Sequence, residues 1–255
     1  AGNGSYTSGG SWRAPTPQFG DDPTVVLGDG QVLAGYFNGT TTYRFNPSAP
    51  AGSQWTTTAG GKLHGDQSDE ETWVKLPDGS ILSYDVFASA GGTFQAQRYI
   101  PSQDKWVDAS NLDPTNPPGI LSTSNEGSEL GPAFLQPDGN VIYFGTNGNT
   151  AIYNPTTDTW SAGPAEPQQG GKNLVGTDDP GVMLPNGKIL IALSPQGGLN
   201  SKGAYTFPSP SYIYEYDPTD QSWTDVTPGG LGSVNAFALN MVLLPTGQVL
   251  LAHEG

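Results

Sequence analysis

The 255-residue chain has no cysteine, and basic residues are scarce. Without cysteine, disulfides, thiolate chemistry and thiolate-ligated metals are excluded. Nine lysines and arginines stand against 24 aspartates and glutamates, which leaves a formal net charge of −15. Nucleic acids and anionic membranes are bound by clustered basic side chains, so the composition argues against both as partners. The acidic balance suits cations, neutral sugars or a life outside the cell.

Long apolar and helical stretches are lacking as well. No apolar run approaches the roughly 20 residues of a membrane-spanning helix. The 36 glycines and 23 prolines leave few uninterrupted segments of helical length. The first residues, Ala-Gly-Asn-Gly, fit a mature protein whose signal segment has been removed, although an arbitrary start would look the same. We therefore expect an all-β protein that is secreted or displayed at the cell surface, with no membrane insertion.

A short apolar run, a Pro-Asp-Gly turn or close variant, and a second apolar run recur five times. The turns end, 48 to 60 residues apart, at Gly30, Gly79, Gly139, Gly187 and Gly247. Asp-Gly and Asn-Gly between apolar runs favour β-hairpins, and we expect two-residue primed turns, whose residues must tolerate positive φ. A period near 50 residues is typical of a β-propeller blade.

An aromatic residue and a later tryptophan follow four of these hairpins. The pairs are Tyr99 with Trp106, Tyr153 with Trp160, Tyr216 with Trp223, and the more widely spaced Phe45 with Trp55. The pattern predicts the third and fourth strands of each blade, joined by a tight turn. We expect each tryptophan to pack between neighbouring blades, because a single sheet cannot bury its own face.

The repeats predict one domain over residues 1–255, a β-propeller of four-stranded antiparallel blades. The expected blades are 21–64, 69–124, 127–171, 176–232, and a fifth that combines 235–255 with 1–14. In the fifth blade the two termini would close the ring and protect its edge strands. The alternative is a fragment of a propeller with six or seven blades.

Three stretches give the chain a resemblance to a known family: residues 69–79, 129–133 and 178–187. They resemble Kelch-type propellers, in particular the kelch-repeat proteins of bacteria and fungi related to the central domain of galactose oxidase. The resemblance covers almost the whole chain and implies the fold rather than an activity, because propellers host many functions. The chain departs from the family in two ways. It lacks the Gly-Gly pair of animal Kelch repeats after most second strands, and five blades are fewer than usual.

The chemistry of galactose oxidase does not follow from this resemblance. That copper centre is built from two histidines, two tyrosines and a tyrosine–cysteine crosslink, and this chain has no cysteine. A P-loop and a dinucleotide fingerprint are also missing from the sequence. We therefore expect neither copper nor a nucleotide as cofactor.

Acidic residues stand at matching positions ahead of the turn glycines. Asp22, Glu71 and Asp179 lie eight residues before theirs, and Glu129 lies ten before. Eight and ten share strand parity, so we expect the four side chains to point alike, toward the mouth of the central channel. Three interpretations stay open: a Ca²⁺ site, glycan hydrolysis with Glu129 and Asp179 as candidate catalytic residues, or carboxylates that only cap the loops.

Two long loops, 87–93 and 194–211, are expected on the same face, and the second carries Tyr205 and Phe207. Exposed aromatic rings with polar neighbours suit stacking on sugars. These two residues, with Trp73, are the predicted ligand-binding residues. The sequence thus favours an extracellular module that binds a carbohydrate or another extracellular protein. A glycoside hydrolase and a structural repeat within a larger surface protein are the alternatives.

Overall fold

The computed structural model describes residues 21–86, 96–111, 121–122, 126 and 129–253. Strands dominate this part of the chain, and a short 3-10 helix, η2 (Ala236–Ala238), precedes the last hairpin. Among the described residues, no helix is long and apolar enough to span a bilayer.

The first three sheets are four-stranded antiparallel meanders, in which each strand pairs with its neighbours in sequence. The first contains β1 (Thr24–Val26), β2 (Val32–Ala34), β3 (Tyr43–Phe45) and β4 (Trp55–Thr57). The second contains β5 (Val74–Lys75), β6 (Ile81–Tyr84), β7 (Ala96–Ile100) and β8 (Lys105–Asp108). The third contains β9 (Ala133–Leu135), β10 (Val141–Phe144), β11 (Thr150–Asn154) and β12 (Thr159–Ala162).

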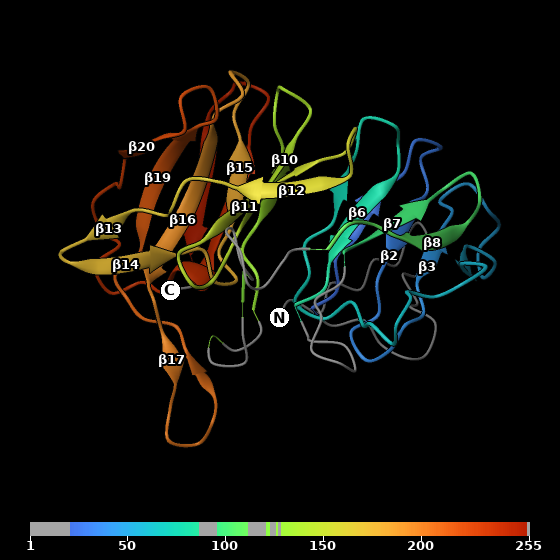
Figure 1. Cartoon of the computed structure of the whole chain (residues 1–255), viewed down its shortest axis with the longest axis horizontal. Helices are drawn as coiled ribbons and strands as arrows, with labels where there is room; N and C mark the ends of the chain where they lie inside the picture. Colours follow the sequence, from blue (N-terminus) through green and yellow to red (C-terminus); the bar gives the residue numbers. More distant parts are fainter. Residues whose placement is uncertain (1–20, 87–95, 112–120, 123–125, 127–128, 254–255) are drawn as a thin grey trace.

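The fourth sheet has the same meander and two additions. Its meander consists of β15 (Gly181–Met183), β16 (Ile189–Pro195), β19 (Tyr212–Asp217) and β20 (Ser222–Asp225). The hairpin of β13 (Gln168–Gln169) and β14 (Lys172–Val175) lengthens it, because Leu174 and Val175 pair with the end of β16 beyond β15. A second hairpin, β17 (Gly198–Leu199) and β18 (Tyr205–Thr206), projects from the body in Figure 1. The repeat in the sequence predicts neither addition.

A fifth sheet is described as the hairpin of β21 (Leu239–Leu243) and β22 (Val249–His253). Residues 1–14, predicted to complete this blade, and the loop 87–93 lie outside the described residues. The third and fourth strands expected for the fifth blade therefore stay a prediction.

The sheets succeed one another across the molecule in sequence order, from the blue first sheet to the orange and red strands at the other end (Figure 1). Innermost strands contact each other, β5 with β9 and β15 with β21. Apolar clusters fill the space between successive sheets; one of them packs Tyr84 of the second sheet with Tyr143 of the third. This is the face-to-face packing that a propeller requires. The fold is an all-β propeller, as predicted.

The aromatic pairs occupy the places that the sequence predicts. Tyr153 lies directly opposite Trp160 in the register of β11 and β12, with ring centroids 5.0 Å apart. The same register joins the other pairs, including the stretched one. Three tryptophans donate their indole N–H to the preceding blade or the segment after it: Trp106 to Thr42 Oγ1 (3.0 Å), Trp160 to Ser110 O (2.6 Å) and Trp223 to Ala165 O (3.1 Å). The predicted packing between blades is confirmed for these three tryptophans and stays a prediction for Trp55.

The repeated turns are hairpins, but the expectation of two-residue primed turns was wrong. Gly79 has a φ of 84°, whereas Asp78 is not among the residues with positive φ. The Gly79 N–H donates to Leu76 O (2.9 Å) and the Leu76 N–H donates to Ser80 O (2.8 Å). These bonds form a type I turn followed by a left-handed glycine, which is a G1 bulge. Asp78 Oδ1 accepts the Ser80 N–H (3.0 Å), which explains an acid before the glycine.

Candidate functional site

Pairs of adjacent acids precede the inner strands of three blades: Asp21-Asp22, Glu70-Glu71 and Asp178-Asp179. Glu70 and Asp178 have φ of 55° and 53°, in the left-handed region. The inner strands begin only later, at Val74 and Gly181. Strand alternation therefore does not extend to the acids, and the two members of a pair enter different surroundings.

The first members, Asp21, Glu70 and Asp178, interact with one another and with two further acids. We call the five residues the mouth acids: Asp21, Asp69, Glu70, Glu129 and Asp178. Burial raises the pKa of Glu70 to about 9, and a hydrogen bond with Glu129 and the charge of Glu129 add to the shift. Burial also raises the pKa of Glu129, whereas the bond with Glu70 lowers it. The two hydrogen-bonded carboxyls therefore share one proton at neutral pH.

Asp178 is a mouth acid that titrates near neutral pH. Desolvation, followed by the charges of Glu129 and Asp21, raises its pKa to about 7. The side chain keeps contact with solvent, so it can exchange protons freely. A carboxyl of this kind can act as a proton donor or acceptor near pH 7.

Glu71, predicted as a metal ligand, lies instead in a buried group around Lys62. Its carboxylate pairs with the Lys62 ammonium and accepts the Trp73 indole N–H (2.9 Å) and the Ser83 hydroxyl (2.9 Å). Asp66 pairs with the same ammonium, and oxygens of Asp66, Glu71 and Asp85 lie within 4.8 Å of one another. The ammonium already supplies a cation to this group.

Protonation reduces the remaining negative charge of the Lys62 group. Burial raises the pKa of Asp85 to about 8, and the nearby charges of Asp66 and Glu71 add to the shift. Burial raises the pKa of Glu71 too, while Lys62 and Trp73 oppose the shift. Three carboxyls around one ammonium thus keep a proton among them at neutral pH.

Asp179, the second acid of its pair, is also buried, with 5% of its surface exposed. Burial raises its pKa well above the ordinary value, and Asp178 and Glu166 add to the shift. Asp22 is half-buried ahead of β1. The structure therefore places Asp22, Glu71, Glu129 and Asp179 in separate surroundings, and their joint binding of one cation stays a prediction.

A pocket of about 420 Å³ opens beside the mouth acids. Inner-strand residues of the third, fourth and fifth blades line it, together with Asp178, Asp179, Asn240 and Phe237. The Phe237 ring packs on Phe207 (centroids 4.5 Å apart), and Phe207 contacts Tyr205 (5.1 Å). Phe237 is 42% exposed. Apolar ring surface and carboxylates therefore adjoin one open pocket.

Two of the three predicted ligand-binding residues belong to this arrangement. Tyr205 and Phe207 meet the pocket through Phe237, and the charge of Asp179 acts on the Tyr205 hydroxyl. Trp73 does not line the pocket, since its side chain is 8% exposed and packs on Trp106 (centroids 5.2 Å apart). Its part in ligand binding stays a prediction.

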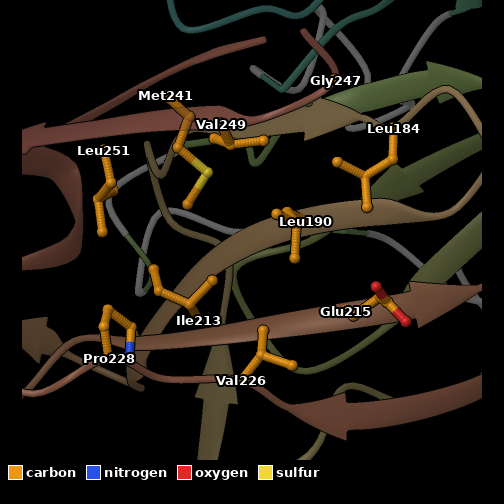
Figure 2. Close-up of a pocket in the computed structure, with 10 residues that line it drawn as sticks. All are labelled: Leu184, Leu190, Ile213, Glu215, Val226, Pro228, Met241, Gly247, Val249 and Leu251. Carbon is orange, nitrogen blue, oxygen red and sulfur yellow. The ribbon is translucent and has the colours of Figure 1, made fainter. Parts of the chain in front are cut away.

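A second pocket, of about 450 Å³, lies between the fourth and fifth blades. Figure 2 shows Met241, Val249 and Leu251 of the β21–β22 hairpin facing Leu190 and Ile213 of the fourth blade. Its one carboxylate, Glu215, pairs with Lys188 (2.8 Å). The lining is apolar and suits packing between blades better than chemistry.

No protein-family model and no curated protein sequence matches the chain. Solved structures do share its fold. The α-L-arabinanase of Penicillium chrysogenum, solved with arabinobiose, is 15% identical, with a TM-score of 0.58 over 91% of this chain and 74% of that one. The extracellular domain assigned to a one component system of B. thetaiotaomicron is 14% identical, with a TM-score of 0.55 over 94% of this chain and 27% of that one.

A copper-bound fungal alcohol oxidase of the AA5 family is also similar, at 14% identity and a TM-score of 0.50 over 83% of this chain and 54% of that one. The chain thus spans about a quarter of the length of the B. thetaiotaomicron domain and about half of the oxidase. At such identities the likeness establishes the fold alone. The relationship to the galactose oxidase propellers and the narrower Kelch assignment stay predictions.

The sequence argument missed Glu70, Asp178, Glu166 and Phe237. The adjacent acids are visible in the sequence, and two acids in a row indicate that one of them does not follow the side-to-side alternation of a strand. Phe237 lies two residues before a predicted inner strand, so its position ahead of the hairpin could have been noticed. Glu166 carries no local signal, because its partner Asp179 is brought close by tertiary packing.

Proposed function

We propose that this protein is an extracellular, Kelch-type propeller that binds a carbohydrate in the pocket beside the mouth acids. The observation that carries the proposal is the contact series Tyr205–Phe207–Phe237 at the edge of that pocket. Aromatic rings stack on the apolar face of a sugar, and carboxylates accept hydrogen bonds from its hydroxyl edges. Asp178 and Asn240 are placed to supply such polar contacts.

The structural neighbours guide the choice of ligand. One is an extracellular domain, and another is an arabinanase solved with arabinobiose. The first supports an extracellular setting, and the second supports a pentose oligosaccharide as the first probe. An extracellular protein that displays such a glycan would serve as the partner.

Titration calorimetry with arabino-oligosaccharides tests this proposal on the full chain. The exposed ring of Phe237 would be removed by Phe237→Ala, and we expect binding to weaken about tenfold, the equivalent of about 1.4 kcal/mol. Phe37→Ala is the matched control, because Phe37 is similarly exposed, at 36%, and does not line the pocket. Equal loss in both variants, or no binding to any glycan in a wider array, would contradict the proposal.

A second candidate function is glycoside hydrolysis, which the titration of Asp178 near pH 7 beside Glu129 favours. Hydrolysis of a glycosidic bond needs two carboxyls in different protonation states. The same oligosaccharides, analysed for shortened products, test it. We expect Asp178→Asn and Glu129→Gln each to abolish turnover in folded protein if the hydrolase is correct. Binding without products supports the binding module. If there is neither binding nor a product, the structural repeat is the interpretation that remains.

A further inference from the structure

Glu166 and Asp179 form a buried acidic pair at the junction of the third and fourth blades. Their exposed fractions are 6% and 5%, and the charge of Glu166 acts on Asp179. None of their four carboxyl oxygens has a side-chain hydrogen-bond donor among the described residues, and only the Gly176 amide of this part of the chain acts on Glu166. Buried polar atoms without sufficient partners are costly, so the two carboxyls, and Asp179 above all, call for a ligand.

The repeat shows what occupies the equivalent place at another junction. The Lys62 N–H donates to Thr40 O (2.7 Å), and the Glu166 N–H donates to Gly148 O (3.0 Å). Two residues after each acceptor stands a threonine whose carbonyl accepts the preceding bond from the same outer segment: Thr42 O from the Thr58 N–H, and Thr150 O from the Gly163 N–H. Lys62 and Glu166 are therefore equivalent residues of their blades.

Asp179 is likewise the equivalent of Glu71, since each lies eight residues before its turn glycine. Glu71 pairs with the Lys62 ammonium at the first junction. At the later junction the lysine is replaced by Glu166, so the ammonium is missing where the carboxylate remains. The side-chain donors of Glu71 are also replaced: Gly181 stands in place of Trp73, and Ile191 in place of Ser83.

Protonation alone does not satisfy this pair. Protonated carboxyls would bring two O–H donors, but the two side chains are not hydrogen-bonded to each other. Burial raises the pKa of Glu166 well above its ordinary value, more than the nearby Gly176 amide lowers it. A hard cation would engage the oxygens directly, and carboxylates are the ligands that Ca²⁺ prefers.

We propose that Glu166 and Asp179 bind a Ca²⁺ ion between the third and fourth blades, in the place that the Lys62 ammonium takes between the first and second. Backbone carbonyls and water would complete the coordination. The ion would act as a structural bridge between blades. The site is distinct from the mouth acids, although Asp179 also adjoins the pocket.

Thermal melts of the full chain at pH 7, in EDTA and then in excess Ca²⁺, test the proposal. At about 100 times the dissociation constant, we expect Ca²⁺ to raise the Tm of the natural protein by about 5 °C. Glu166→Lys rebuilds the lysine–carboxylate pair of the first junction. It should melt in EDTA at least as high as the Ca²⁺-loaded natural protein and gain nothing from Ca²⁺.

Glu129→Gln is the matched control, because it removes a mouth acid and leaves the pair intact. We expect it to keep the full Ca²⁺ shift, and Asp179→Asn to lose it. A shift that disappears in Glu129→Gln and survives in Asp179→Asn would overturn the proposal in favour of the mouth acids. No shift in the natural protein would also overturn it.

Equilibrium dialysis with labelled Ca²⁺ keeps the question answerable if a variant melts poorly. Glu166→Gln changes the charge of the pair and hardly its volume, so it serves as the milder variant. We expect one ion per chain to be lost in Glu166→Gln relative to the natural protein. Equal amounts of bound Ca²⁺ in the two proteins would contradict the assignment.

Discussion

The Lys62 side chain is enclosed completely, and its ammonium lies among three buried carboxyls at the junction of the first and second blades. Asp66 and Glu71 pair with it directly, and its Nζ lies 5.7 Å from the Trp106 ring centroid. A buried charge is tolerated when its partners remain, and becomes very costly when one is removed. The stability of this part of the blade therefore depends on a single lysine.

Substituting Lys62→Met should lower the free energy of unfolding by about 3–5 kcal/mol, because the carboxyls lose their shared cation. Urea denaturation at pH 7 measures the change. Lys202→Met is the control, since Lys202 is exposed on the β17–β18 hairpin and should change stability by less than about 0.5 kcal/mol. Similar values for the two variants would show that the ammonium is not needed.

At the scale of the elements, the repeated hairpin turn has the same backbone conformation in each blade but different packing contacts. Gly139 and Gly187 have φ of 88° and 84°, so both turns require the left-handed region. A Cβ at Gly139 would meet nothing within 4 Å, whereas one at Gly187 would lie 2.6 Å from Pro137 Cγ of the preceding blade. The fourth turn therefore packs on its neighbour and the third does not.

Gly139→Ala and Gly187→Ala separate the backbone cost from the packing cost. Both should destabilise by about 1 kcal/mol through the left-handed φ, and Gly187→Ala should lose about 1–3 kcal/mol more through the clash with Pro137. Urea midpoints of the two variants, measured side by side, give the difference. Equal losses would mean that Pro137 moves aside at no cost.

Short-range patterns predict this fold well, and tertiary placement limits the prediction of the site. The turn glycines and the Tyr153–Trp160 spacing depend on neighbours in sequence, so strand order and register could be read in advance. Glu70 and Asp178 could not be placed, because their left-handed φ breaks the alternation on which the argument relied. Glu166 meets Asp179 only after two blades have packed together.

At the scale of the whole molecule, bound protons as well as the Lys62 ammonium reduce the negative charge of the buried carboxyls. The folded pKa is raised to about 9 at Glu70 and to about 8 at Asp85, in both cases first by burial. A group with a raised pKa contributes stability that is complete below its unfolded pKa and is lost as pH rises through the folded value. The pKa of Asp78 is lowered by its bonds to Ser80 and by the charge of Arg98. Its effect on stability has the opposite sign, because the stability that it contributes is lost only as pH falls below about 4.

In EDTA, the free energy of unfolding should therefore fall as pH rises from 5 to 7. The expected slope is at least about 1.4 kcal/mol per pH unit, which corresponds to one proton held only by the folded state. Urea denaturation at pH 5, 6 and 7 measures it. Stability that stays level or rises over this range would show that these carboxyls are ionised in the folded protein.

The indole bonds of Trp106, Trp160 and Trp223 all run from a later blade to an earlier one. During synthesis the chain emerges from its N-terminus, so each acceptor is already made when its tryptophan leaves the ribosome. A blade can then dock as soon as its own four strands are complete. The direction of these bonds thus allows the blades to assemble in the order in which they are translated.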